Sequence, residues 1–108
     1  IGSSGAEALA TMLRTNKTIT ELQIPYNDIG AIGAQALAEM LPSNGTLEHL
    51  DLRSNRMGPA GGSAIADGLL SNPKNKLKVC RVADNRMGDE VASQVAACMR
   101  GTTKHGLV

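Results

Sequence analysis

Residues 47–57 read LEHLDLRSNRM, and this stretch decides the fold because its pattern occurs twice more. Residues 19–29 read ITELQIPYNDI, and residues 77–87 read LKVCRVADNRM. Each segment carries apolar residues at its positions 1, 4, 6 and 11 and an asparagine at position 9. The segments start at 19, 47 and 77, so they are spaced by 28 and 30 residues. A recurring unit of this length is typical of a stacked repeat architecture.

The two halves of each unit predict a strand followed by a helix. In the first half, Leu22 and Ile24 alternate with Gln23, which is the period of a strand with one buried face. The second half is rich in glycine and alanine, and its apolar spacing predicts helices over 33–41, 61–69 and 91–99. Strands joined through helices lie parallel, and neighbouring units must stack to bury their apolar faces.

The beginning of the chain belongs to the same pattern. Residues 1–13 read IGSSGAEALATML and residues 29–41 read IGAIGAQALAEML, with nine of the thirteen paired positions identical. We therefore predict one array, with a partial repeat at 1–18, repeats at 19–46, 47–76 and 77–104, and a tail at 105–108. The additional residues of the third spacing fall in 72–76, around Pro73, and the array is expected to be part of a longer one.

These repeats resemble the leucine-rich repeat family. The 28-residue spacing is similar to the ribonuclease-inhibitor-like class, which includes the Ran GTPase-activating protein and the sensor regions of NOD-like receptors. The resemblance implies an α/β solenoid with short parallel strands on the concave face and helices on the convex face. It implies a scaffold, and one scaffold can host many functions.

Composition argues against nucleic-acid and membrane partners. Lysine and arginine number 11 against 10 acidic residues, which leaves a net charge of +1. Tyr26 is the one aromatic residue, so bases have almost no platform on which to stack. No run of about 20 apolar residues is present to span a bilayer. We expect a protein partner instead.

The cysteines and histidines do not form a catalytic set. Cys80 takes the apolar position held by Leu22 and Leu50, and Cys98 takes an apolar position of the last helix. We therefore expect two buried, reduced thiols and a cytoplasmic location. His49 precedes Leu50 and is therefore expected to face away from Cys80, which argues against a nucleophile–base pair. No catalytic, cofactor or metal motif occurs, and we expect neither enzyme activity nor a cofactor.

The recurring asparagines are expected to have structural roles. Asn27, Asn55 and Asn85 follow the strands, where a side-chain amide can satisfy backbone groups at the turn. Asn16 and Asn44 begin Asn-x-Thr sequences, which also match the acceptor for N-glycosylation. Because these sequences recur in register, we interpret them as turns from helix into strand.

The outward strand positions supply the candidate binding surface. They align across the predicted sheet as three rows: Glu21, His49, Val79; Gln23, Asp51, Arg81; and Pro25, Arg53, Ala83. Lateral pairs are expected between Asp51 and Arg81 and between Glu21 and His49, because parallel neighbours lie ~4.8 Å apart. The candidate partner-binding residues are Glu21, Gln23, Tyr26, His49, Asp51, Arg53 and Arg81.

The function predicted from the sequence is a non-enzymatic scaffold for protein–protein interaction, binding through the concave strands. Two alternatives are open: a regulator of a small GTPase, and a structural segment of a larger immune-sensor or cytoskeletal protein. Neither end of the sequence shows a polar capping repeat, so we also expect end-to-end self-association.

Overall fold

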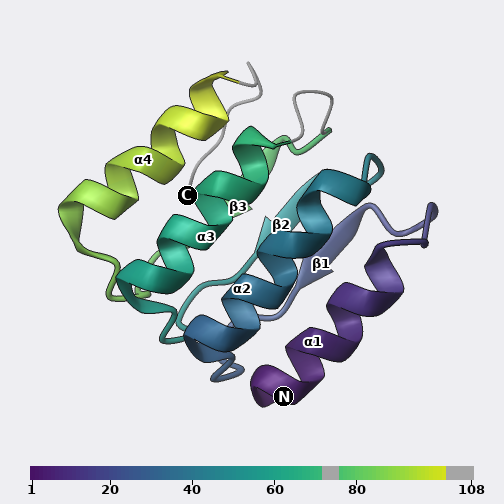
Figure 1. The fold of residues 1–108 in the computed structure, drawn as a ribbon, viewed down its shortest axis with the longest axis horizontal. Coiled ribbons are helices and arrows are strands. Elements are labelled where there is room, and N and C mark those ends of the chain that lie inside the picture. The colour runs from purple at the N-terminus through teal and green to yellow at the C-terminus, as the bar shows by residue number, and fades with distance from the viewer. Residues whose placement is uncertain (72–75, 102–108) are drawn as a thin grey trace.

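The computed structural model describes residues 1–71 and 76–101, with side chains to residue 96. Strands and helices alternate along the chain (Figure 1). The elements are α1 (Gly2–Leu13), β1 (Glu21–Gln23), α2 (Gly30–Met40), the 3₁₀ helix η1 (Leu41–Ser43), β2 (His49–Asp51), α3 (Gly58–Leu70), β3 (Val79–Arg81) and α4 (Gly88–Gly101).

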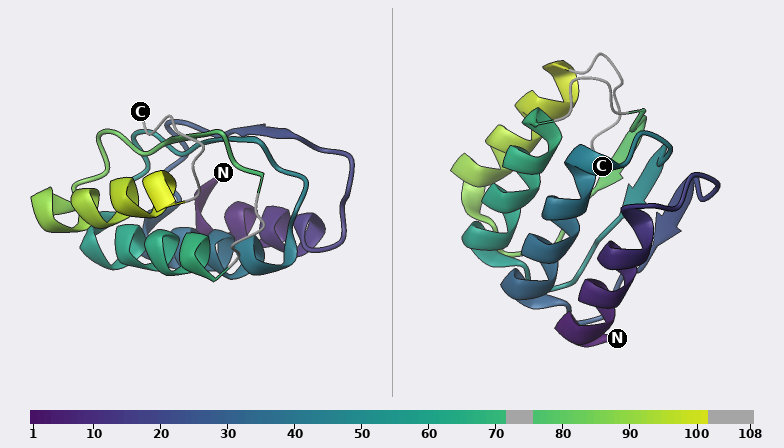
Figure 2. Two further views of the ribbon diagram at one scale, coloured as in Figure 1. Left: turned by 90° about the horizontal axis from the view of Figure 1, so that it is seen from above. Right: turned by 45° about the vertical axis from the view of Figure 1, so that its right-hand side comes forward.

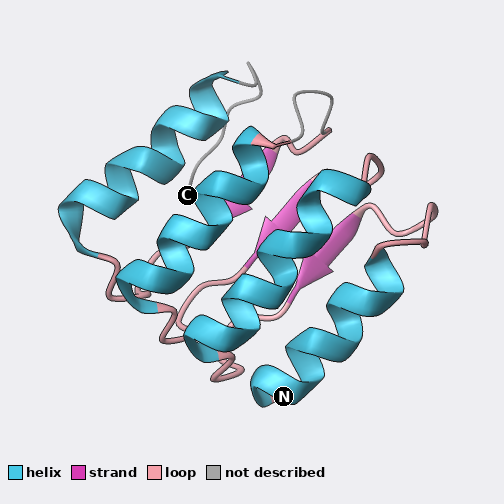
Figure 3. Cartoon of the chain, viewed as in Figure 1, coloured by secondary structure: helices cyan, strands magenta, loops and turns pink. Residues whose placement is uncertain are grey.

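The helices and strands form two layers. The four helices lie side by side in one layer, and the strands lie together behind them (Figures 1 and 3). Viewed from above, the strands and their connecting loops run along the opposite side from the helices (Figure 2). Adjacent strands pair in parallel in the order β1-β2-β3, as expected when each connection passes through a helix.

The register of the sheet is the one predicted from the repeats. Leu22 pairs with Leu50, and Leu50 pairs with Cys80, so the inward positions form one row. Neighbouring strands are ~4.8 Å apart, whereas packed helices need about 8–10 Å. A stack of these units therefore curves with its strands on the inner side. This architecture confirms the α/β leucine-rich repeat solenoid.

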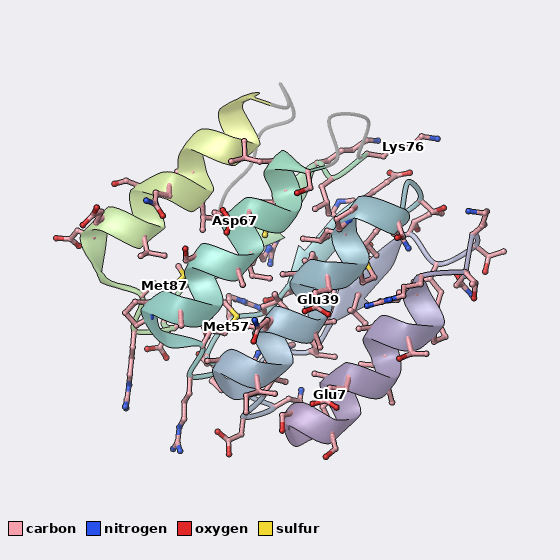
Figure 4. The ribbon with its side chains drawn as sticks, in the orientation of Figure 1. Glu7, Glu39, Met57, Asp67, Lys76 and Met87 are labelled. Atoms are coloured by element: carbon pink, nitrogen blue, oxygen red, sulfur yellow. The ribbon has the colours of Figure 1, made fainter. Side chains whose placement is uncertain are left out.

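The core lies between the two layers and is built from small aliphatic side chains. Leu50, Leu52 and Cys80 supply it from the strand side, and Leu37 and Ile65 supply it from the helices. All five are almost completely buried. Met57 and Met87, just before the starts of α3 and α4, belong to the same core (Figure 4). Flexible methionine side chains fill such irregular space well.

The helices begin earlier than the sequence pattern predicted. We expected starts at 33, 61 and 91, but α2, α3 and α4 begin at Gly30, Gly58 and Gly88. Gly30 and Gly58 both have φ +66°, so the sharp turn occurs at the first glycine. The later glycines lie within helices: a Cβ on Gly33 would lie 3.1 Å from the Ala6 Cβ. They allow neighbouring helices to approach closely.

The asparagines after the strands form the predicted backbone-capping ladder. The Asn55 Oδ1 accepts hydrogen bonds from the backbone N–H groups of Asn27 (2.8 Å) and Ile29 (3.4 Å). Its Nδ2 donates to three backbone carbonyls, those of Ile24, Leu52 and Arg53, at 2.9–3.1 Å. Each such asparagine joins its own turn to the preceding repeat, and Asn85 repeats the arrangement one unit later.

The Asn-x-Thr sequences occupy the turns from helix into strand, as interpreted. The Asn44 Oδ1 accepts from the backbone N–H groups of Thr46 and Leu47, both at 2.9 Å. Its Nδ2, the atom that glycosylation would modify, donates to the Leu13 carbonyl and is buried. Asn16 holds the preceding turn in the same way through its Oδ1. Pro73 lies outside the described residues.

Candidate partner-binding face

The outward side chains of the three strands surround a hollow of about 220 Å³. We call this surface the strand face. It brings together five of the seven residues predicted from the sequence, Glu21, Gln23, His49, Asp51 and Arg81, and adds Leu50 and Val79. The same alternation that marked the polar positions also places Val79 outward, so the sequence contained the signal for it. The hollow therefore mixes charged walls with an apolar patch.

Asp51 is the most buried charged residue of the strand face. Its side chain is only 7 % exposed, because the Arg53 guanidinium covers it. The Arg53 Nη2 donates to Oδ2 at 2.8 Å, Nε donates to Oδ1 at 3.0 Å, and the Arg53 backbone N–H donates to Oδ1 at 3.1 Å. This two-pronged geometry is the strong form of an arginine–carboxylate pair. The sequence predicted Arg81, on the neighbouring strand, as the ion-pair partner of Asp51, and this prediction is wrong. Asp51 pairs instead with Arg53, two residues further along its own chain segment.

Electrostatics keep Asp51 ionised. Burial alone would raise the pKa of this carboxyl group, but the hydrogen bonds from Arg53 and the charges of Arg53 and Arg81 outweigh it, so its pKa is lowered. The hydrogen bond and charge of Asp51 in turn raise the pKa of Arg53. Asp51 therefore stays negative and fixes Arg53 in place.

Arg81 has a different situation from Arg53. It lies opposite Asp51 in the register of β2 and β3, and its side chain is exposed. Within the described residues, its guanidinium makes no hydrogen bond or ion pair, although its charge contributes to the lowered pKa of Asp51, which Arg53 holds. Arg81 is thus an exposed cation on the wall of the hollow.

Glu21 and His49 form the other side of the hollow, as predicted. The His49 Nδ1 lies 3.9 Å from the Glu21 Oε1, and the Gln23 Nε2 donates to the Glu21 Oε2 at 2.7 Å. The pair between Glu21 and His49 is ionic only when the imidazole is protonated. The hollow consequently has an acidic end at Glu21 and a basic end at Arg81.

Tyr26 lies just past the end of β1 and outside the hollow. Its side chain is 78 % exposed, and its backbone has φ +57°, a left-handed conformation that bulky residues rarely adopt. The Tyr26 N–H donates to the Arg53 carbonyl at 3.0 Å, which places the two residues side by side. Tyr26 and Arg53 extend the strand face beyond the hollow.

Cys80 is packed beneath the strand face, and its thiol is unreactive. It is fully buried, as predicted, and burial with a smaller contribution from Asp51 raises the pKa of its thiol to about 12. A thiol that stays protonated at neutral pH is a poor nucleophile. His49 lies on the opposite side of β2 and β3, in the hollow. The side chain of Cys98 lies outside the described residues.

The helix layer offers a second concavity, of about 330 Å³, between α1 and α2. Its lining includes Glu7, Glu39 and the exposed side chain of Ile32, with an ion pair of 3.6 Å between Arg14 and Glu39. Figure 4 shows Glu7, Glu39 and Asp67 projecting from the helices, so acidic groups mark this layer. The helix layer is the alternative surface against which the strand face must be tested.

Side chains that ligate metals are scattered over the part of the chain that the structure describes. No group of three or more histidine, cysteine, aspartate or glutamate side chains there could hold a metal ion. None of the helices in the same residues combines the length and the apolar character needed to cross a bilayer.

A family comparison identifies the repeats. Residues 15–38 and 43–66 match the family described as "Leucine Rich repeat". The match likens these two segments to leucine-rich repeats. They contain β1 and β2 with most of the helices that follow them, α2 and α3, so the matched repeats supply a large part of the strand face.

A solved structure extends the comparison to the whole chain. The chain is similar to "Leiomodin-1 Actin-Binding Site 2 (ABS2)", with a TM-score of 0.85 and 25 % sequence identity. The match covers 100 % of this chain and 64 % of the leiomodin chain. A comparison with curated protein sequences gave no match.

Proposed function

We propose that this protein is a non-enzymatic module for protein–protein interaction and that it binds its partner through the strand face. The observation that carries the proposal is the hollow of about 220 Å³, where the exposed Arg81 guanidinium, the Glu21 carboxylate and the apolar side chain of Val79 come together. Concave repeat surfaces bind extended partners, and mixed charge favours one orientation of the partner.

The repeats are further assigned to the ribonuclease-inhibitor-like class, forming one array over residues 1–108. This assignment is supported by the spacing of 28 and 30 residues and by a full helix of 11–14 residues in each of α2, α3 and α4.

A cytoskeletal role is the second candidate. It is favoured by the likeness to the actin-binding site of leiomodin-1 along this whole chain. The chain spans only 64 % of that leiomodin chain, so actin binding by this chain needs its own test. Cosedimentation with actin filaments and pyrene-actin assembly provide that test. Regulation of a small GTPase stays a prediction, and multiple-turnover GTP hydrolysis with and without the chain tests it.

A reducing, cytoplasmic compartment is also proposed. It is supported by the buried free thiol of Cys80 and by the inward-facing amide of Asn44, which is inaccessible to glycosylation machinery.

The strand face is tested by a matched pair of substitutions. Val79→Arg places a long cation in the hollow, and Ile32→Arg makes the same change of type and charge on the helix layer, where Ile32 is 64 % exposed. Wild type and both variants are used to capture partners from cell lysate after equal circular dichroism and thermal unfolding have been established.

Loss of a partner with Val79→Arg and retention with Ile32→Arg supports the proposed face. Loss with Ile32→Arg alone would move the site to the groove between α1 and α2, and equal capture by all three chains would exclude both surfaces.

A further inference from the structure

The two arginines of the strand face have unequal roles. Arg53 is held by the Asp51 carboxylate through both Nε and Nη2, whereas Arg81 beside it has no anionic partner among the described residues. A planar guanidinium with unpaired donors suits a carboxylate in two-pronged geometry. The Asp51 carboxylate, held by Arg53, attracts Arg81 but forms no ion pair with it, so within the described residues the Arg81 guanidinium stays available to a partner's carboxylate.

Tyr26 is the second observation. The corresponding residues of the next two repeats are Ser54 and Asp84, which share its left-handed backbone, with φ +57° at all three positions. Ser54 and Asp84 bond to each other across adjacent repeats, since the Ser54 Oγ donates to the Asp84 Oδ2 at 2.9 Å. Tyr26 instead projects an aromatic ring into solvent beside Arg53. Tyrosine is enriched where protein interfaces bury an amphipathic anchor.

We propose that the strand face binds an extended, acidic segment of a protein, with a carboxylate of that segment on Arg81 and an adjacent part of it against Tyr26. This inference rests on the proposed function and adds the chemistry of the partner. Glu21, at the other end of the hollow, favours a cationic or neutral residue there, so the segment binds in one direction.

The charges favour a peptide over a nucleic acid. A polyphosphate would meet the exposed carboxylate of Glu21 in the same hollow as Arg81. The whole chain carries a net charge of only +1, and Tyr26 is its one aromatic residue. Nucleic-acid binding depends on many uncompensated cations and on stacking platforms. A segment with one or two well-placed carboxylates avoids this repulsion.

The test uses a library of randomised peptides displayed on phage and selected on the full chain. Enriched peptides are synthesised, labelled with fluorescein and titrated with wild type, Arg81→Met, Arg81→Lys and Lys17→Met. Lys17 is exposed in the turn before β1, so Lys17→Met removes the same charge away from Arg81 and serves as the matched control.

We expect an acidic residue at one fixed position of the enriched peptides. Replacing it with its amide, or making Arg81→Met, should each weaken binding ~10-fold or more, the usual loss for a charge-assisted hydrogen bond. The double change should cost little more than either single one, because both remove the same contact. Arg81→Lys should recover part of the affinity, and Lys17→Met should bind as wild type does.

Four outcomes would overturn the inference. Peptides without a fixed acidic residue, acidic peptides insensitive to Arg81→Met, or no enriched peptide at all would each do so. Tighter binding of a single-stranded DNA oligonucleotide than of any peptide would also contradict it. If the selected peptides lose binding with Val79→Arg but not with Arg81→Met, the strand face binds the peptides and only the contact between Arg81 and a carboxylate is refuted. If neither substitution weakens binding, the strand face is refuted as the binding surface as well.

Discussion

Asn55 uses both the oxygen and the nitrogen of its side-chain amide, and its position in the repeat lets it bond to two neighbouring repeats. Its side chain is fully buried and bonds to five backbone groups in two repeats. Removing one partner of a buried hydrogen bond leaves the other desolvated, which costs about 1–3 kcal/mol per group. The asparagines are thus the residues that join one repeat to the next.

The first prediction concerns this ladder. Asn55→Ala should lower the free energy of unfolding by more than about 2 kcal/mol, because the half-buried N–H of Asn27 and the buried N–H of Ile29 lose their acceptor. Asn27→Ala is the control, since the Asn27 side chain makes only exposed or half-buried bonds, and it should cost less. Urea unfolding of both variants measures this, and equal losses would contradict the ladder's role.

The second prediction concerns the pH dependence that Cys80 confers. The ordinary pKa of a cysteine thiol is 9.0, and burial raises the pKa of Cys80 to about 12 in the fold. The unfolded chain therefore releases this proton first as pH rises. The resulting stabilisation is complete below about pH 9 and is lost progressively between pH 9 and 12.

The Cys80→Val variant lacks this titration. Both chains carry Cys98→Ser, so that residue 80 is the only difference between them. From about pH 8 to pH 10 the free energy of unfolding should fall in the chain that keeps Cys80 by about 1 kcal/mol more than in the Cys80→Val variant. The two chains differ only at residue 80, so the contributions of all other groups cancel in the difference. Parallel pH profiles for the two chains would show that Cys80 is not buried as described.

At the scale of elements, close contact between helices depends on glycine. A Cβ on Gly68 in α3 would lie 2.6 Å from the Ala38 carbonyl oxygen in α2, and a backbone atom cannot yield as a flexible side chain can. By contrast, a Cβ on Gly45, in the turn before β2, would meet nothing within 4 Å.

The third prediction compares these two glycines. Gly68→Ala should destabilise the fold by about 1–3 kcal/mol, since overpacking outweighs the gain of up to ~1 kcal/mol in helix propensity. Gly45→Ala should be neutral or slightly stabilising because it restricts the unfolded chain. Thermal unfolding distinguishes them, and a stabilised Gly68→Ala chain would mean that α2 and α3 pack less closely than described.

The elements also show how far sequence reasoning reached. The spacing of apolar residues predicted the strands and their register, because each strand position repeats its role in every unit. Helix starts were missed by three residues, since the sequence alone does not say whether Gly30 or Gly33 makes the turn. The sequence predicted an ion pair between Asp51 and Arg81 because the repeats show which residues are neighbours across the sheet. They do not show how a side chain bends, and the Arg53 side chain folds back over the Asp51 carboxylate.

At the scale of the whole molecule, the described sheet has two open edges, β1 and β3. Edge strands with unpaired backbone groups can pair with another chain. Our fourth prediction is therefore that copies of this chain associate end to end, so that the mass measured by light scattering rises with concentration. A constant monomeric mass up to high concentration would refute it.

The central claim is that the partner meets the strands and not the helices, and carboxylate footprinting tests it on the unmodified chain. Glu21 on the strand face and Glu39 on α2 are matched probes, with side chains 53 % and 62 % exposed. Both are labelled with carbodiimide and glycine ethyl ester, in the free chain and in the complex with its captured partner, and quantified by mass spectrometry. The strand face as binding surface predicts that labelling of Glu21 falls on complex formation while labelling of Glu39 does not change; protection of Glu39 with Glu21 still labelled would contradict it.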